Sequence, residues 1–162
     1  MRKVLFLDRD GTINIDYGYV YKIENFVLIN GILDVAKVAK QKGYDLIVVT
    51  NQSGIERGYY TDADFQKLTQ HMCALFEKNG TPLLDVFYCP FLSGNDRKPN
   101  PGMFLKAKQK YQIDMKNSVS AGDKVSDIEA ATKAGVGHNY LLSSDPQPNT
   151  ISKITELIDL LK

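Results

Sequence analysis

Hydrophobic and polar positions divide the chain into short apolar runs and longer amphipathic stretches that alternate from one end to the other. Five runs rich in Val, Ile, Leu and aromatic residues predict strands at residues 3–8, 45–51, 85–90, 118–123 and 137–142. Several of these runs lack the polar alternation of a half-exposed strand, which indicates burial on both faces.

Amphipathic stretches between and after these runs predict five helices, at residues 31–43, 61–80, 101–111, 126–135 and 150–162. Thr61 is a candidate N-cap, Gly43 a stop signal and Pro101 a first-turn residue. Alternating strands and helices are typical of an α/β fold, a doubly wound, Rossmann-like parallel sheet with helices on both faces. A length of 162 residues suits a single domain, which we expect to span residues 1–162.

Composition excludes several classes of protein. The net charge is +1, from 20 basic and 19 acidic residues, which argues against a nucleic-acid binder held by bulk charge. The two cysteines, Cys73 and Cys89, form no Cys-x-x-Cys pair and no disulfide framework. The first apolar run, Val4 to Leu7, is too short for a signal peptide, and no run reaches the ~18 apolar residues of a membrane span. We therefore expect a cytoplasmic protein that binds neither nucleic acid nor membranes.

Chemically active side chains follow four of the predicted strands, where the strands of a parallel sheet present their ligands. They are Asp8 and Asp10 after the first strand, Thr50 and Asn51 after the second, Arg97 and Lys98 after the third, and Asp123, Lys124 and Asp127 after the fourth. Solvated turns would explain any one of these groups alone, but four of them at one sheet edge favour a shared site.

Asp8 and Asp10 are two residues apart, so an extended segment would point both acids to the same side. Two adjacent negative charges indicate a task that needs them, such as binding a metal ion. Arg9 between them is predicted to point away and to form a structural ion pair. Gln52 and Ser53 are interpreted as turn formers.

The stretches DRDGT, TNQSG, RKPNPG and GDKVSD resemble, in this order, the four motifs of the haloacid dehalogenase-type phosphatases. The resemblance covers nearly the whole chain. Within that superfamily the chain is most similar to the D-glycero-D-manno-heptose 1,7-bisphosphate phosphatases, through DRDGTINIDYGYVYKIENFVLINGILD, TNQSGIERGYYT and DRKPNPGM. The histidinol-phosphate phosphatases are the sister group and share much of the first and third motifs, whereas GIERGYYT favours the heptose enzymes.

This resemblance implies a Mg²⁺-dependent phosphomonoester hydrolase that removes the 7-phosphate of a heptose bisphosphate, a precursor in lipopolysaccharide synthesis. Histidinol phosphate is the alternative substrate. Asp8 would be the nucleophile and form an aspartyl phosphate, which splits one difficult displacement into two steps. Asp10 would protonate the leaving oxygen and then activate water as a base.

The resemblance also implies which residues bind phosphate and metal. Lys98 would neutralise the phosphate and orient Asp8. The remaining phosphate or sugar contacts would come from Thr50, Asn51, Arg97 at the distal end of the substrate, and Lys124. Magnesium would be held by Asp8, the backbone carbonyl of Asp10, and Asp123. Asp127 either orients Lys98 or Lys124 from behind the site or caps the following helix, and the sequence leaves these roles open.

Two other classes share part of this pattern. Signalling receiver domains also carry an aspartyl phosphate, Mg²⁺ and a lysine, but an acid two residues after the nucleophile suits hydrolysis better. An inactive structural relative is disfavoured because all the core residues are present.

No separate cap domain is expected, because only ~18 residues separate Thr12 from Gly31. The site should therefore be open and shielded by loops. Candidates for lining it are Tyr17, Tyr19, Tyr21, Arg57, Tyr59 and Tyr60. The expected partner is a small phosphorylated sugar, and we expect a monomer.

Many relatives in both groups carry a zinc loop before the Arg-Lys-Pro motif, with the pattern Cys-x-His, a spacer and Cys-x-Cys. This chain keeps only Cys89, and it has Phe91, Gly94 and Asp96 at the other ligand positions. Because a structural zinc site needs four soft or imidazole ligands, we predict no zinc. Pro90 and Phe91 are predicted to anchor the shortened loop by packing.

Overall fold

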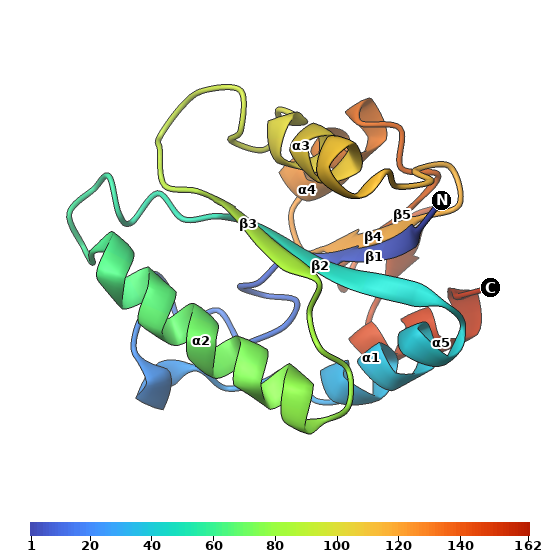
Figure 1. The fold of residues 1–162 in the computed structure, drawn as a ribbon, viewed down its shortest axis with the longest axis horizontal. Coiled ribbons are helices and arrows are strands. Elements are labelled where there is room, and N and C mark those ends of the chain that lie inside the picture. The colour runs from blue at the N-terminus through green and yellow to red at the C-terminus, as the bar shows by residue number, and fades with distance from the viewer.

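The computed structural model describes residues 1–162 and contains one six-stranded parallel sheet in the order β3-β2-β1-β4-β5-β6 (Figure 1). The strands are β1 (Lys3–Leu7), β2 (Tyr44–Asn51), β3 (Asp85–Cys89), β4 (Val119–Gly122), β5 (His138–Leu142) and β6 (Thr150–Ile151). Five of them match the predicted strands to within one residue at each end. The predicted doubly wound α/β fold is confirmed.

Helices cover both faces of the sheet. They are α1 (Ile32–Gln41), α2 (Asp62–Lys78), α3 (Gly102–Tyr111), α4 (Val125–Lys133) and α5 (Leu157–Leu160), with 3₁₀ turns η1 at Ile23–Asn25 and η2 at Ile154–Glu156. Figure 1 shows α3 and α4 on one face, and α1, α2 and α5 on the other. The connection from β1 to α1 holds only η1, and the connection from β2 to β3 holds only α2, so neither contains a cap domain.

The central strand β1 explains why the apolar runs lack polar alternation. Leu5 and Leu7 pack into the core beneath α1 and α2, whereas Val4 and Phe6 pack into the second core beneath α3 and α4. All four side chains are at most 1% exposed. A strand buried on both faces must be apolar at every position, and burial of this kind is the main force that holds the sheet between its two helix layers.

Local signals mark the start of α2 and the end of α1. Thr61 caps α2, since its hydroxyl accepts the Asp64 N–H at 3.1 Å while the Asp64 carboxylate accepts the Thr61 N–H at 2.9 Å. Gly43 follows α1 with φ +84°, a conformation that disfavours side chains. Pro101 lies just before α3 rather than in its first turn, because the helix begins at Gly102.

The predicted helix at residues 150–162 is wrong over most of its length. Thr150 and Ile151 pair with Leu141 and Leu142 as the sixth strand, and α5 contains only four residues. The buried positions Ile151, Ile154, Leu157 and Leu161 are spaced three or four residues apart, which imitates one helix face. This spacing is produced here by a strand, a 3₁₀ turn and a short helix in succession.

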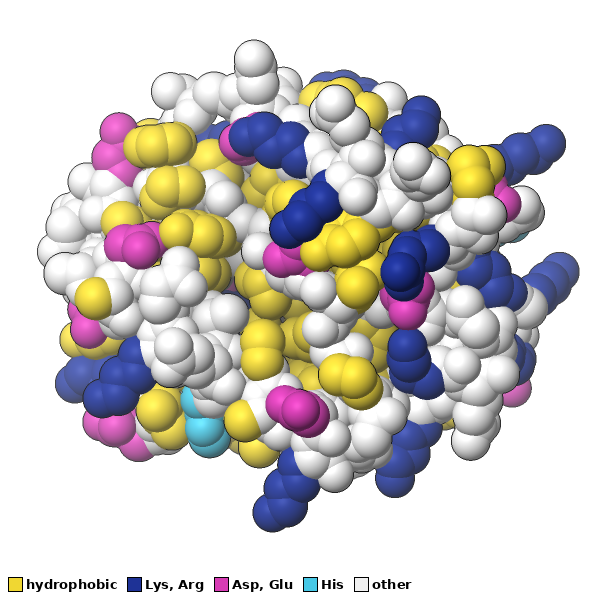
Figure 2. Space-filling model, in the orientation of Figure 1, with side chains coloured by type: hydrophobic (Ala, Val, Ile, Leu, Met, Phe, Trp, Pro, Cys, Tyr) yellow, Lys and Arg dark blue, Asp and Glu magenta, His cyan; other side chains and the backbone are white.

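Two features of the whole molecule bear on its partners. None of the helices combines the length and the apolar character needed to cross a membrane. Figure 2 shows apolar side chains across the middle of one face, over β2 and β3, with charged side chains of both signs around them.

Candidate active site

The strand order places β1 between β2 and β4, so the carboxyl ends of these three strands are neighbours. Asp8 and Asp10 follow β1, Thr50 and Asn51 end β2, and Asp123 follows β4. The long loop after β3 brings Lys98 to the same edge. The structure therefore gathers residues from all four predicted strand ends.

Lys98 is the centre of this cluster and is only 3% exposed. Its ammonium donates to Asp8 Oδ1 at 3.0 Å, to the Val49 carbonyl at 2.7 Å, and lies 2.6 Å from Asp127 Oδ1. These three acceptors use all three of its protons. Burial lowers the pKa of Lys98, but Asp8 and Asp127 more than offset this, so its pKa lies above the usual value. The lysine stays charged.

Asp127 makes both of the contacts that the sequence left open. One carboxylate oxygen faces Lys98, while Oδ2 accepts the backbone N–H of Lys124 at 3.0 Å at the start of α4. Gly122 makes room for this carboxylate, since a Cβ there would lie 2.4 Å from Asp127 Oδ2. The absence of a side chain at Gly122 thus allows the Asp127 carboxylate to lie against the end of β4.

Asp8, Asp123 and Asp127 each place a carboxylate oxygen within 4.8 Å of the others. Asp123 Oδ1 is buried and has no hydrogen-bond partner. Burial raises the pKa of Asp8 well above its usual value; Lys98 opposes this, and Asp127 and Asp123 reinforce it. Burial likewise raises the pKa of Asp123. Excess negative charge, hard oxygen donors and an unpartnered buried oxygen fit a Mg²⁺ ion held by Asp8 and Asp123.

Asp10 is held by three side chains. Arg9 Nη2 donates to Asp10 Oδ2 at 3.0 Å, Asn14 Nδ2 donates to Oδ1 at 3.0 Å, and Gln52 Nε2 donates to Oδ2 at 3.0 Å. Arg9 therefore forms the predicted ion pair, but its partner is Asp10, and the prediction that Arg9 points away is wrong. The reason is that β1 ends at Leu7, so the alternation of an extended strand does not reach residues 8–10.

Asn51 was expected to contact phosphate or sugar, and the structure directs its amide to the backbone of Lys98. The Lys98 N–H donates to Asn51 Oδ1 at 3.0 Å, and Asn51 Nδ2 donates to the Lys98 carbonyl at 3.1 Å. This pair of hydrogen bonds joins the end of β2 to the loop that carries Lys98.

Gln52 and Tyr60 belong to the site although sequence reasoning treated Gln52 as a turn former. Gln52 is 3% exposed, donates to Thr50 Oγ1 at 2.9 Å as well as to Asp10, and accepts a hydrogen bond from the Tyr60 hydroxyl. Thr50, at 1% exposed, lies beneath the surface of the site. The only available signal was the place of Gln52 directly after β2, at the same sheet edge as Asp10.

A cavity of about 580 Å³ opens beside these residues. Positively charged side chains contribute strongly to its lining, namely Arg57, Arg97, Lys98 and Lys124, whereas Asp10 and Asp16 are its acids. Tyr19 and Tyr60 also line the cavity, but Tyr17, Tyr21 and Tyr59 do not. Such a concentration of cations attracts anionic ligands.

The start of the loop after Cys89 is held by hydrogen bonds to its backbone carbonyls. Phe91 is 56% exposed, so the prediction that its side chain anchors the loop by packing is wrong. Its carbonyl instead accepts from Cys89 Sγ at 3.8 Å and from Arg97 Nη1 at 3.3 Å. The Pro90 carbonyl accepts the Glu56 N–H at 3.2 Å. Hydrogen bonds to these two carbonyls, rather than packing of the Phe91 ring, hold the start of the loop.

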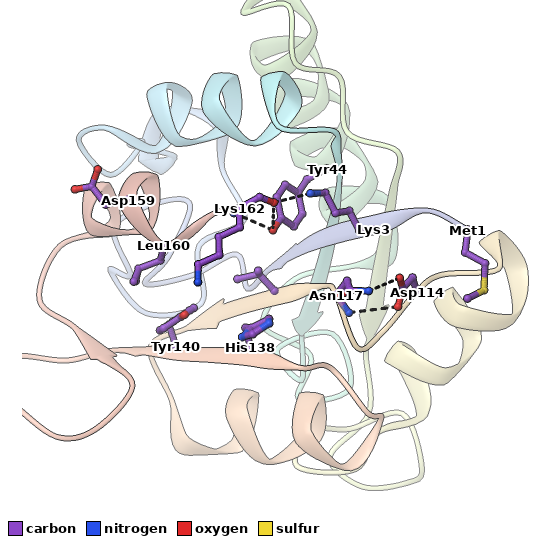
Figure 3. Close-up of a pocket in the computed structure, with 11 residues that line it drawn as sticks. Met1, Lys3, Tyr44, Asp114, Asn117, His138, Tyr140, Asp159, Leu160 and Lys162 are labelled. Carbon is purple, nitrogen blue, oxygen red and sulfur yellow. Dashed lines mark hydrogen bonds between the residues drawn. The ribbon is translucent and has the colours of Figure 1, made fainter.

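A second cavity, of about 510 Å³, lies at the opposite, amino-terminal edge of the sheet (Figure 3). Two of its side chains bind the same group of the lining, as Tyr44 and Lys3 both donate to the Lys162 carbonyl, at 3.1 and 2.6 Å. None of the predicted site residues lines it. The carboxylate cluster belongs to the other edge.

Comparison with known proteins agrees with this geometry. Residues 3–145 match the family model described as polynucleotide kinase 3 phosphatase. The D-glycero-alpha-D-manno-heptose-1,7-bisphosphate 7-phosphatase of Campylobacter jejuni is 46% identical over 144 residues, covering 88% of this chain and 84% of that protein. The D-glycero-beta-D-manno-heptose-1,7-bisphosphate 7-phosphatase of Helicobacter pylori is 44% identical over 169 aligned positions, covering 99% of this chain and 98% of that protein.

Among solved structures, D,D-heptose 1,7-bisphosphate phosphatase from B. bronchiseptica, complexed with magnesium and phosphate, superposes with a TM-score of 0.87. It is 24% identical, and the match covers 98% of this chain and 97% of that one, which establishes a common fold. Together with the family model and the close relatives, the ordered motifs and the buried Asp8–Lys98 pair lead to one assignment. The chain belongs to the haloacid dehalogenase-like phosphatases, within the family of the heptose-1,7-bisphosphate 7-phosphatases.

Proposed function

We propose that this phosphatase removes the 7-phosphate of D-glycero-D-manno-heptose 1,7-bisphosphate, with Mg²⁺ and through an aspartyl phosphate on Asp8. The observation that supports this substrate best is the cavity beside Asp10, which Arg57, Arg97 and Lys124 line together with Lys98. A substrate with two phosphates needs positive charge both at the reacting phosphate and at a distance from it. The names of the Campylobacter jejuni and Helicobacter pylori relatives agree with this choice.

In the first half-reaction, a carboxylate oxygen of Asp8 attacks phosphorus and the bond to the sugar oxygen breaks. Lys98, with its charge fixed by two buried carboxylates, stabilises the oxygens of the transferring phosphoryl group. Asp10 gives its proton to the departing sugar oxygen. Thr50, Arg97 and Lys124 are proposed as further contacts to phosphate or sugar, and Asn51 contributes by holding the Lys98 segment.

In the second half-reaction, Asp10 takes a proton from water, the water oxygen attacks phosphorus, and the bond to Asp8 breaks to release inorganic phosphate. Magnesium, held by Asp8, Asp123 and the Asp10 carbonyl, would supply positive charge against the phosphoryl oxygens. Asp127 keeps Lys98 in place through their contact of 2.6 Å. The same carboxyl group, Asp10, serves as acid and then as base.

A panel of phosphate esters assayed with Mg²⁺ tests the substrate. It contains both anomers of heptose 1,7-bisphosphate, because the relatives' names are divided between alpha and beta. It also contains histidinol phosphate, a 3′-phosphorylated oligonucleotide, prompted by the name of the matched family model, and p-nitrophenyl phosphate. We expect the highest kcat/KM for a heptose bisphosphate, with the 1-phosphate as product.

A higher kcat/KM for histidinol phosphate would overturn the substrate and favour the sister activity. A single stoichiometric labelling event without turnover would instead indicate a receiver-like module. An Asp8→Asn preparation made in parallel controls for contaminating phosphatases, since it must lose whatever activity the wild type shows.

We further propose that the chain acts as a single domain and a monomer in the cytoplasm, independently of nucleic acid and membranes. Two observations support this arrangement. All the helices pack around one sheet, and every residue of the candidate site belongs to this chain. Light scattering at working concentration tests the oligomeric state, and the mass of a dimer would contradict the proposed monomer.

A further inference from the structure

The loop that follows β2 places a buried tyrosine behind the acid–base residue. We propose that Tyr60 is a positioning residue for the reaction: acting through Gln52, it fixes the orientation of the Asp10 carboxyl group. This inference rests on the proposed function only in taking Asp10 as the general acid and base. It does not depend on which phosphate ester is the substrate.

The hydrogen bonds of Gln52 have only one consistent direction. The Tyr60 hydroxyl donates to Oε1, which leaves the two protons of Nε2 for Asp10 Oδ2 at 3.0 Å and Thr50 Oγ1 at 2.9 Å. A flipped amide would turn its oxygen toward the Asp10 carboxylate, where two acceptors would face each other. The Asp10 carboxylate therefore sets the amide orientation, and the Tyr60 hydroxyl, by donating to Oε1, holds the amide in that orientation.

Tyr60 itself is held firmly. It is 5% exposed, and its ring stacks on Tyr21 with centroids 5.4 Å apart and an interplanar angle of 10°. Gly54 makes the space, since a Cβ there would lie 2.2 Å from the Tyr60 ring. Burial raises the pKa of Tyr60 to about 12, so the hydroxyl remains a donor at physiological pH.

Gln52 links Asp10 to a different strand end from the one that carries it. The other donors to this carboxyl group, Arg9 and Asn14, belong to the same turn as Asp10. Only Gln52 comes from the end of β2. A group that gives a proton in one half-reaction and takes one in the other must present the same oxygen to the substrate each time. The contact from Gln52 ties the rotation of the carboxyl group about its Cβ–Cγ bond to the neighbouring strand, in addition to the restraint from Arg9, which donates to both oxygens.

The first test compares leaving groups in a single turnover. Tyr60→Phe keeps the ring and its stacking but removes the proton donor. We expect alcohol release from a sugar phosphate to slow by about tenfold, because general-acid help is worth ~10²–10⁴ and is only partly lost. Release of p-nitrophenol, which leaves without strong protonation, should slow by less than about threefold, and KM measured in the steady state should be unchanged for both esters.

The second test asks whether Tyr60 acts through Gln52. In a double-mutant cycle with Gln52→Met, which keeps a similar volume, Tyr60→Phe should cost less than about threefold when the amide is already absent. Tyr111→Phe is the matched control, because its hydroxyl also donates to a carboxylate, Asp85 at 2.6 Å, but far from the site. Tyr111→Phe should leave the release rates of both leaving groups unchanged.

Equal slowing of both leaving groups, no slowing at all, or additive effects in the cycle would each overturn the proposal. Should Tyr60→Phe fail to fold, Gln52→Met alone must show the same dependence on the leaving group, or the proposal is wrong. A wild-type protein that hydrolyses p-nitrophenyl phosphate but no heptose bisphosphate would contradict the proposed substrate, and the cycle would still decide the role of Tyr60.

Discussion

Lys98 and Asp127 form a contact of 2.6 Å, and the same ammonium lies 3.0 Å from Asp8, so one buried cation serves two buried carboxylates. Neither acid has Lys98 to itself, and Asp123 adds a third carboxylate nearby. The cluster is therefore electrostatically incomplete without a further positive charge. This incompleteness, together with the contacts around Asp10, leads to the following predictions.

Asp8→Asn should lower kcat by at least about a thousandfold, as expected on removal of a nucleophile. The variant should fold normally, because asparagine has nearly the same shape and relieves repulsion within the cluster. Steady-state assays with thermal unfolding in parallel test both statements. Activity within tenfold of the wild type would show that Asp8 is not the nucleophile.

Asp10→Asn should also stop steady-state turnover, but for a different reason. Asp8 can still attack an ester with a good leaving group, whereas no base remains to activate water. With p-nitrophenyl phosphate we expect a fraction of the protein to carry a phosphoryl group on Asp8, detected by mass spectrometry after acid quench. Normal steady-state rates would refute the acid–base role, and Asp8→Asn serves as the control without an adduct.

Magnesium should stabilise the fold more at about pH 8 than at about pH 5. In the metal-free chain, the raised pKa values of Asp8 and Asp123 mean that their contribution to stability is present at low pH and is lost as the pH rises through those values. Magnesium binds the ionised carboxylates, so it restores most where protons no longer compete. Thermal unfolding with and without Mg²⁺ at the two pH values measures the difference.

The matched variants for this measurement are Asp123→Asn, which should lose most of the Mg²⁺ effect, and Asp159→Asn, an exposed acid at the opposite cavity, which should keep it. An equal shift in the unfolding temperature at both pH values would mean that Mg²⁺ does not bind to the ionised cluster.

Gly11→Ala should weaken Mg²⁺ binding and activity by about 10- to 100-fold, the range typical of residues that orient metal ligands. A Cβ at Gly11 would lie 2.2 Å from Asp123 Oδ2, so Asp123 must move. Gly135→Ala is the control, because its φ of +92° is close to the +88° of Gly11 and nothing lies within 4 Å of its added Cβ. Backbone strain is then similar in the two variants. Equal losses of activity would show that strain, and not displacement of Asp123, causes the effect.

The shortened loop after β3 should bind no zinc. Only Cys89 remains of the ligand pattern seen in many relatives, and one thiol with one carboxylate does not complete a tetrahedral site. Metal analysis of the purified protein tests this prediction. About one tightly held zinc per chain would contradict it.

The apolar runs predicted five of the six strands because β1, β2 and β4 are buried on both faces. Such strands are continuous apolar runs, which loops rarely contain. The C-terminal segment was predicted wrongly because Ile151, Ile154, Leu157 and Leu161 have helical spacing while the backbone changes from strand to helix. Periodicity records which residues are buried and does not record the backbone conformation that buries them.

The place of the charged residues could be predicted, but their hydrogen-bond partners could not. The strand-end rule brought Asp8, Lys98 and Asp123 to one edge, where the structure has them. The Asn51 amide turns back to the Lys98 backbone because the segments after β2 and β3 meet, and Gln52 reaches Asp10 because the segments after β2 and β1 meet. Such loop geometry is set by tertiary contacts that no local pattern contains.

The all-parallel order of the strands has a consequence for how the enzyme forms. Asp8 and Lys98 are 90 positions apart in sequence, and β1 must pair with both β2 and β4 before its carboxyl end has neighbours. No hairpin can bring these residues together early, since parallel strands are joined only by long crossovers. During refolding, catalytic competence should therefore return with closure of the sheet centre, later than the helical signal in circular dichroism.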